Sequence, residues 1–279
     1  MHGLSEASLH CLALHLAGRT LTDKNRRLLE VARSLPRLAQ ILLANQLKQF
    51  LHLAEEILHR LAGDSVVTLA DSDYPQLLQE ISTAPFALFL RGNRQLIATE
   101  KVSIVGTREP SAAGRIAAKN VAAYFSAKGR VIVSGIARGI DAVVHHAALQ
   151  AGGATIAVLP NGFNHLYPLE NRDIYALSGT SDRILLLSEY APEEKPQRYQ
   201  FVRRNRIIAG LSPTTIVIEA GMKSGAMITV NHALEAGRDV AALSHVSLTN
   251  NAGGEKLVAD GAIDLTALAF EAKVRERIM

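Results

Sequence analysis

The sequence predicts an α/β fold built on an open, mostly parallel sheet, and two observations support this. With 48% hydrophobic residues among 279, the chain can bury a full core. From Lys101 onward, short apolar, β-branched runs alternate with helical segments, which is the pattern of βαβ units. The expected strands are 102–106, 131–135, 155–159, 184–188, 215–219 and 239–243. The expected helices lie near 112–128, 140–151, 171–178, 200–210 and 226–236, with more helix after 254.

Residues before this alternation are predicted to be mostly helical. Leu47, Phe50 and Leu51 illustrate apolar side chains at helical spacing. The turn at Gly63-Asp64 then gives two predicted domains, a helical one over 1–64 and an α/β one over 65–279. Just after the turn, strands are expected at 66–69 and 86–90, with a short helix at 75–81.

Composition and charge restrict the class of protein. A single cysteine, Cys11, excludes a disulfide within the chain and favours a reducing compartment. No apolar run is long enough to cross a bilayer, so a soluble, cytoplasmic protein without membrane contact is expected. Residues 101–210 carry 14 Lys/Arg against 8 Asp/Glu. This excess suits a polyanionic partner such as nucleic acid, and a solvated basic surface is the alternative.

Ligands of parallel sheets bind beyond the carboxyl ends of the strands, and the first such loop lies in VSIVGTREPSAAG, residues 102–114. Gly106 allows a sharp turn, and Ser111 can cap the following helix. The N–H groups of that helix favour an anion, and Arg108 adds donors suited to phosphate. The alternative is an ordinary strand-to-helix turn with Arg108 in water.

Two more loops contain glycines next to cations. In SGIARGID, residues 134–141, Gly135 would allow a ligand to approach the backbone, and Arg138 lies at the turn. Asp141 is expected to be structural, and His145 to be a core or capping residue more often than a site residue. The loop EAGMKSGAMIT, residues 219–229, forms a second predicted phosphate cradle with Lys223, Ser224 and Gly225.

The loop after the fourth strand interleaves cations with aromatic rings, as a groove for single-stranded nucleic acid does. Its cations are Lys195, Arg198, Arg203, Arg204 and Arg206, and its rings are Tyr199 and Phe201. At least one arginine of this run is expected to form a buried ion pair with Glu219 or Asp141. In the loop after the third strand, Phe163 and Tyr167 either stack bases or pack within the domain, and both interpretations stay open.

Several catalytic signatures are absent from the sequence. It contains no G-x-G-x-x-G, no G-x-x-x-x-G-K-[ST] and no G-x-S-x-G, which disfavours dinucleotide cofactors, P-loop hydrolysis and a serine nucleophile elbow. None of the ten histidines pairs with another at i, i+4, so no metal site is expected. We therefore expect a protein that is not an enzyme and carries no cofactor.

Ordered motifs between Val66 and Ala262 resemble those of the DNA processing protein A (DprA, or Smf) family. They are DSDYP at 71–75, PFALFLRGN at 85–93, GTREPSAAG at 106–114, SGIARGID at 134–141, AVLPNGFNHLYP at 157–168, Ser188-Glu189, FVRRNRIIAGLS at 201–212 and IEAGMKSGAMIT at 218–229. The resemblance implies an extended Rossmann-like, doubly wound domain that binds single-stranded DNA, dimerises and helps to load the RecA recombinase in natural transformation.

The resemblance also implies residue roles. Arg108 would contact the DNA backbone, Arg198 would contact phosphate, and Phe201 would stack a base. The glycines and serines expected to line the pocket are Gly106, Gly135, Gly225, Ser111 and Ser224.

The chain differs from the family pattern in three places. Ser244-His245 replaces the Pro-Gly that often follows the last strand. No winged-helix domain is expected after the α/β domain. The N-terminal region matches the sterile-alpha-motif-like domain of the family in position and helicity only. A nucleotide-binding or nucleoside-monophosphate-processing protein is the rival function, but such enzymes use P-G-G-x-G-T-x-x-E, whereas Glu219 here precedes its loop.

Overall fold

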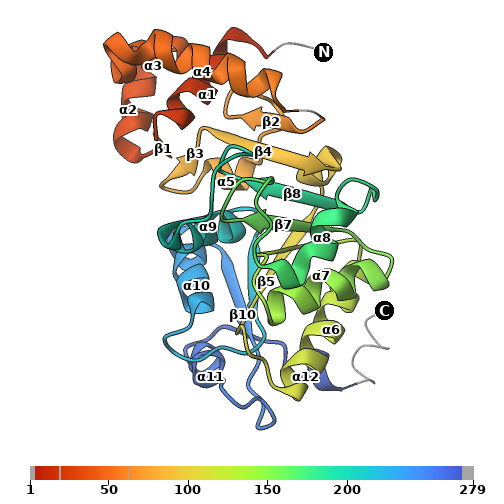
Figure 1. Ribbon diagram of the computed structural model, residues 1–279. Helices are drawn as coiled ribbons and strands as arrows, with labels where there is room; N and C mark the ends of the chain where they lie inside the picture. The colour runs from red at the N-terminus through yellow and green to blue at the C-terminus, as the bar shows by residue number, and fades with distance from the viewer. Residues whose placement is uncertain (1–3, 19, 62, 272–279) are drawn as a thin grey trace.

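A mostly parallel sheet forms the centre of the molecule in a computed structural model that describes residues 4–18, 20–61 and 63–271 (Figure 1). Among these residues, nine strands form one sheet in the order β11-β10-β9-β5-β6-β7-β8-β4-β2. The parallel strands are β5 (Lys101–Val105), β6 (Val131–Ser134), β7 (Thr155–Leu159), β8 (Ile184–Ser188), β9 (Thr214–Val217), β10 (Asp239–Ala242) and β11 (Ile263–Asp264). The antiparallel strands at the other edge are β4 (Ala87–Gly92) and β2 (Ser65–Thr68).

The order in which strands are added to the sheet reverses between β5 and β9, although the two strands are parallel. From β5 the chain proceeds through β6, β7 and β8, and it then returns to place β9 on the other side of β5. The loops that leave β5 and β9 therefore diverge to opposite faces. Such a switch point is where open α/β sheets form their ligand crevice.

Helices cover both faces of the sheet, which confirms the doubly wound fold. They are α6 (Ala112–Ala127), α7 (Ile140–Gln150), α8 (Arg172–Leu177), α9 (Arg198–Gly210), α10 (Gly225–Glu235), α11 (Ala252–Ala259) and α12 (Thr266–Phe270). Adjacent residues of β5 separate the two layers. Ile104 packs with α6, α7 and α12, whereas Val105 packs with α9, α10 and α11. Both faces of β5 are thus buried, as its β-branched apolar residues Val102, Ile104 and Val105 predict.

The N-terminal residues are helical, as predicted, and lie over the β2–β4 edge of the sheet (Figure 1). Their helices are α1 (Glu6–Leu16), α2 (Asp23–Ala32), α3 (Leu35–Leu43) and α4 (Leu47–His59), with a 3-10 turn, η1, at Ala44–Gln46. Cys11 and Leu14 share one apolar cluster with Phe86 and Leu88, so the core continues across the turn at residue 64. The division into two domains at that turn stays a prediction.

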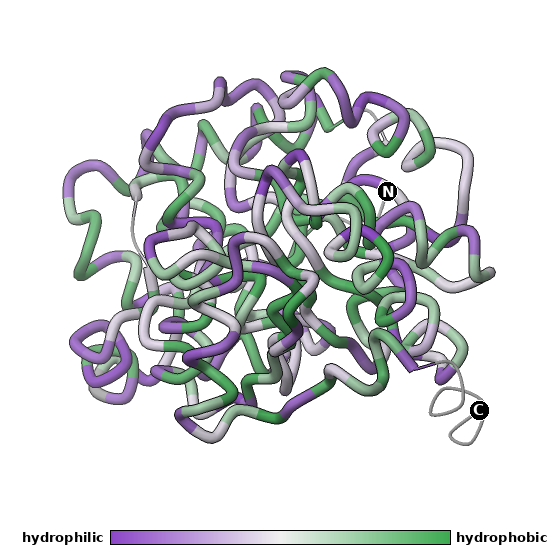
Figure 2. Tube along the Cα trace, turned by 90° about the horizontal axis from the view of Figure 1, so that it is seen from below, coloured by the Kyte–Doolittle hydropathy of each residue, from purple (hydrophilic) through white to green (hydrophobic). Residues whose placement is uncertain are grey.

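Short elements connect these layers. They are β1 (Thr20–Leu21), which pairs with β3 (Ala84–Pro85), helix α5 (Gln76–Gln79), and the 3-10 turns η2 (Arg94–Ala98) and η3 (Leu169–Asn171). Figure 2 shows the hydrophobic stretches gathered towards the middle and hydrophilic stretches on the outer loops and helices. Within the described part of the chain, no helix has the length and apolar character needed to cross a membrane.

Several element boundaries differ by one or more residues from the sequence prediction, and two of these bear on the site. Helix α9 begins at Arg198, because Gln197 and Gln200 form a reciprocal capping box that starts the helix before residue 200. Strand β9 ends at Val217, so Glu219 lies beyond the ladder. Beyond β10, the main chain at Ser244 is held by Thr266, whose Oγ1 accepts from Ser244 N at 2.8 Å.

Candidate nucleic-acid interface

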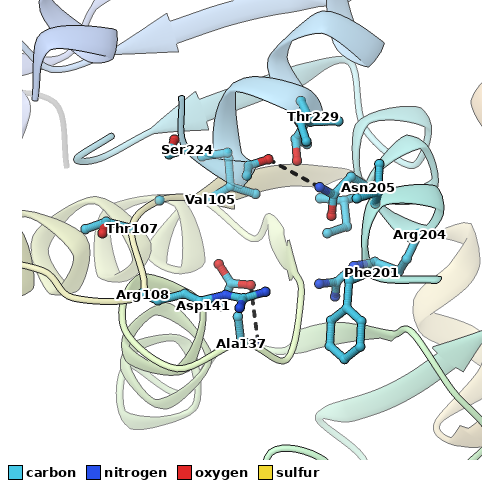
Figure 3. A pocket seen from close by; sticks show the side chains of 16 residues that line it. Val105, Thr107, Arg108, Ala137, Asp141, Phe201, Arg204, Asn205, Ser224 and Thr229 are labelled. Atoms are coloured by element: carbon cyan, nitrogen blue, oxygen red, sulfur yellow. Dashed lines mark hydrogen bonds between the residues drawn. The ribbon is translucent and has the colours of Figure 1, made fainter. Parts of the chain in front are cut away.

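A cavity of about 420 Å³ lies at the switch point, beyond the carboxyl ends of β5 and β9. Four segments that are far apart in the sequence line it: the loop after β5, the turn between β6 and α7, one face of α9, and the N-terminal turns of α10 (Figure 3). The predicted site residues that line it are Gly106, Arg108, Phe201, Arg204, Ser224 and Gly225. The loops chosen from the sequence therefore do meet, but only part of each faces the cavity.

Contacts with α7 and with the segment after β9 fix the loop after β5. Thr107 N donates to Glu219 O at 2.7 Å, and Ile140 N donates to Thr107 O at 3.1 Å. A Cβ on Gly106 would lie 2.6 Å from Cγ1 of Ile140, so this close packing requires glycine. The side chain of Arg108 is left exposed at the mouth of the cavity.

Ser111 does not line the cavity, in contrast to its predicted role. It caps α6, with its Oγ accepting from Gly114 N at 3.0 Å. Its N and Oγ both donate to Oε2 of Glu219, at 2.9 and 3.0 Å. The buried Glu219 carboxylate thus serves as the anion at the N-terminus of α6. The phosphate cradle expected around Ser111 is already filled by the protein itself.

Arg204 and Asp141 form the buried floor of the cavity (Figure 3). Nη1 of Arg204 donates to Val158 O, and Ala137 N donates to Oδ2 of Asp141 at 3.4 Å. Burial raises the pKa of the Asp141 carboxyl, and the Arg204 guanidinium opposes that rise. A Cβ on Gly135 would overlap both side chains, so Gly135 supports the floor without lining the cavity.

Arg203 and Arg206 point away from the cavity towards Glu189. Nη2 of Arg206 lies 2.5 Å from Oε1 of Glu189, and Nη2 of Arg203 lies 3.0 Å from the same atom. Burial alone would raise the pKa of Glu189, but Arg206, His15 and Arg203 hold it below its ordinary value. The expected buried ion pair exists, but its acid is Glu189 and not Glu219 or Asp141.

Arg108, Phe201 and Tyr167 form a row at the mouth of the cavity. The guanidinium carbon of Arg108 lies 6.0 Å from the centroid of the Phe201 ring, which is within cation–π range. The Tyr167 ring meets Phe201 edge to face, with 5.4 Å between centroids. Phe163, by contrast, is buried, with Arg91 over its ring. Tyr199 faces a different cavity.

The remaining predicted cations are exposed and lie outside the cavity lining. They are Arg138, Lys195, Arg198 and Lys223. Arg138 lies 3.4 Å from Glu170, and both of these side chains are solvated. Ser224 is the N-cap residue of α10, but its side chain makes no capping bond, and its buried Oγ has no hydrogen-bond partner in the described residues. Ser224 nevertheless lines the wall of the cavity.

Asn205 and Thr229 also line the cavity and were not singled out from the sequence. Nδ2 of Asn205 donates to Gly225 O at 3.2 Å, which ties α9 to α10 (Figure 3). Helical spacing is the signal that could have found them, because Asn205 is four residues after Phe201 and Thr229 is four after Gly225.

His145 is a core residue, as expected. Its Nε2 lies 2.5 Å from Gly135 O and its Nδ1 lies 2.6 Å from Oγ1 of Thr155. Burial lowers the pKa of His145 to about 4. In the part of the chain that is described, no group of three or more His, Cys, Asp or Glu side chains is placed to hold a metal ion.

Comparisons with known proteins identify the family of this chain. Residues 65–271 match the family described as DNA recombination-mediator protein A. DNA processing protein DprA of Bacillus subtilis is 40% identical over 224 residues, covering 79% of this chain and 75% of the relative. DprA of Streptococcus pneumoniae is 43% identical over 196 residues, covering 70% and 68%.

Solved structures give the same family. The crystal structure of DprA from S. pneumoniae superposes with a TM-score of 0.80 at 33% identity, covering 94% of this chain and 96% of that one. DprA from Helicobacter pylori, described with a unique single-stranded DNA binding mode, superposes with a TM-score of 0.67 at 27% identity, covering 77% and 95%. The chain therefore belongs to the DNA recombination-mediator protein A family.

Proposed function

We propose that this protein binds single-stranded DNA at the cavity between β5 and β9 and performs no chemical step on it. One observation carries the proposal. The exposed Arg108 lies over Phe201 at the mouth of a cavity whose opposite wall is the N-terminus of α10. A guanidinium and a helix N-terminus suit phosphates, and an aromatic ring suits a base. The single-stranded DNA binding mode described for the H. pylori relative supports the same ligand.

The distribution of carboxylates supports a polyanionic ligand. Two acids close to the basic segment are already engaged within the protein: Glu189 is paired with Arg203 and Arg206, and Glu219 accepts hydrogen bonds from main-chain and hydroxyl donors. The exposed cations are therefore not balanced by these acids. When these cations contact DNA phosphates, the counterions bound to the phosphates are released, so the affinity for DNA should fall as the salt concentration rises.

The placement of Glu219 favours binding over nucleotide processing. Its Oε2 accepts from Ser111, and its Oε1 accepts from the backbone N–H groups of Thr249 and Asn250 at 3.1 and 3.2 Å. All of these contacts hold the carboxylate away from the cavity lining. A hydrolase acting on nucleoside monophosphates needs an acid directed at its substrate.

Family membership supports a proposal about the wider role. We propose that the protein acts as a homodimer in the cytoplasm, where it passes single strands to the RecA recombinase during uptake and processing of DNA. Family membership and the proposed groove support this role.

Fluorescence anisotropy with labelled oligothymidylate and a duplex of equal length, over a series of salt concentrations, tests the binding function. Tighter binding to the single strand, weakening as salt rises, is expected. Equal or tighter binding to the duplex, or no salt dependence, contradicts the proposal. Incubation with nucleoside monophosphates should release no free base, and released base would favour the rival enzyme.

A further inference from the structure

Tyr167 is the residue outside the cavity lining that is best placed to extend the binding groove. We propose that Tyr167 is a second base-stacking platform, so that a single strand leaves the cavity across Phe201 and continues over Tyr167. The inference rests on the proposed function and adds a contact and a path to it.

The geometry of the two rings supports a continuous path. Their centroids are 5.4 Å apart and their planes cross at 75°. Tyr167 is 47% exposed, so a large part of its ring faces solvent. Leu166 and Leu169 beside it are also exposed, at 45% and 66%. An exposed apolar strip that continues from a nucleic-acid groove suits the faces of bases.

Tyr167 is held in place through its main chain. The buried Tyr175 hydroxyl donates to Tyr167 O at 2.9 Å and accepts from Tyr167 N at 3.4 Å. Further along the loop, Nδ2 of Asn171 donates to Ile136 O and Ala137 O at 2.9 and 3.1 Å. These bonds fix the loop against the segment that lines the cavity. A residue whose main chain is already fixed loses less conformational freedom when a base stacks on its side chain.

Arg138 is a cation placed to meet the next phosphate, because it directly follows the residues, Ile136 and Ala137, to which the Tyr167 loop is bonded. The side chain of Arg138 is 63% exposed, and in the described part of the chain it pairs only with Glu170, three residues after Tyr167. This pair spans 3.4 Å with both side chains in water, which makes it weak. A phosphate can therefore compete with Glu170 for Arg138.

Tyr199 is two residues before Phe201 in the sequence, yet it does not share this path. It is 59% exposed and lines a separate cavity with His15, Glu189 and Arg203. The aromatic partner of Phe201 thus comes from a loop 34 residues earlier in the chain and not from its own helix. Tyr199 is a matched control, because it is an exposed tyrosine that faces a different cavity.

The test measures oligothymidylate affinity by anisotropy for four variants of the full chain: Tyr167→Ala, Tyr167→Leu, Tyr167→Phe and Tyr199→Ala. We expect Tyr167→Ala and Tyr167→Leu to lose about fivefold or more in affinity, because a stacking ring is removed. Tyr167→Phe and Tyr199→Ala should stay within about twofold of wild type. Thermal unfolding checks that each variant is folded, which is expected because Tyr175 holds main-chain atoms only.

An oligonucleotide with consecutive abasic sites separates stacking from phosphate contact. Wild type and Tyr167→Ala should bind this oligonucleotide with the same affinity, because the base that would stack on Tyr167 is already missing. Unchanged affinity of Tyr167→Ala for intact oligothymidylate overturns the inference, and so does full recovery in Tyr167→Leu, which would make the ring a mere support for Phe201. Failure of the wild-type protein to bind single strands at all would instead overturn the proposed function.

Discussion

Arg206 reaches Glu189 with 2.5 Å between Nη2 and Oε1, and both side chains are more than nine-tenths buried. This ion pair separates the arginines of the RRNR run, residues 203–206, into two groups. Arg203 and Arg206 hold Glu189, while Arg204 lies at the floor of the cavity. The basic run is therefore partly structural and partly a binding surface.

Removing the charge of Glu189 should destabilise the fold. In Glu189→Gln the buried Arg206 loses its counter-ion, and we expect a cost of about 3 kcal/mol in the free energy of unfolding. Denaturant unfolding measures this. Glu170→Gln, which breaks the exposed pair with Arg138, should cost less than about 1 kcal/mol. Equal costs for the two variants would contradict the assignment of Arg206 to the core.

Ser111→Ala should change stability without changing DNA affinity. The substitution removes the cap of α6 and one donor to Glu219, at a cost of about 1 kcal/mol. Affinity for oligothymidylate should stay within about twofold, because Ser111 lies outside the cavity lining. Urea unfolding and anisotropy measure the two quantities on the same preparation. A clear loss of affinity in the folded variant would return Ser111 to the binding surface.

Gly135→Ala should disturb the cavity floor. The added methyl overlaps Arg204 and Asp141, and such overpacking costs about 1–3 kcal/mol. The affinity for oligothymidylate should fall as well, because the methyl group displaces Arg204 from the floor of the cavity. Gly225→Ala is the control for stability, since a Cβ there meets nothing within 4 Å, and its change should stay within about 0.5 kcal/mol. Stability of Gly135→Ala equal to wild type would show that the floor is not tightly packed.

Stability should fall as pH is lowered through the range in which His145 titrates. Its pKa is about 4 in the folded protein against an ordinary 6.5, so between these values the unfolded chain binds more protons. The contribution is complete above pH 6.5 and is lost towards pH 4, amounting to about 3 kcal/mol.

Unfolding by urea at several pH values checks this. His145→Gln cannot take up that proton, so its stability should depend less on pH. A remaining slope is expected from His15, whose pKa is also lowered by burial. An unchanged pH dependence in His145→Gln would exclude His145 as the source.

The fold could be predicted well from the sequence, because the patterns that specify its strands and helices lie within short stretches of sequence. Alternating apolar strands and helices, each ended by a glycine or polar turn, determine the parallel units in order. The short edge strand β11 was not predicted, since two residues such as Ile263 and Asp264 carry no periodic signal. The core shared by Cys11 and Phe86 joins segments far apart in sequence, and no local pattern shows that contact.

The candidate site could be predicted to the level of loops but not of every side chain. The carboxyl ends of β5 and β9 bring their loops together, as parallel strands must. Which arginines face the cavity depends on the rotation of α9. Phe201, Arg204 and Asn205 share one face at helical spacing, and Arg203 and Arg206 share another. The occupation of the α6 N-terminus by Glu219, 108 residues after Ser111, depends on the completed sheet.

The salt dependence of single-strand binding by Arg108→Ala tests the central claim most directly. If Arg108 contacts a DNA phosphate at the mouth of the cavity, the variant binds more weakly, and the slope of log affinity against log salt falls by about 0.7. Arg27→Ala, which removes an exposed arginine of α2, should leave both quantities unchanged. Wild-type affinity and slope in Arg108→Ala would contradict the account.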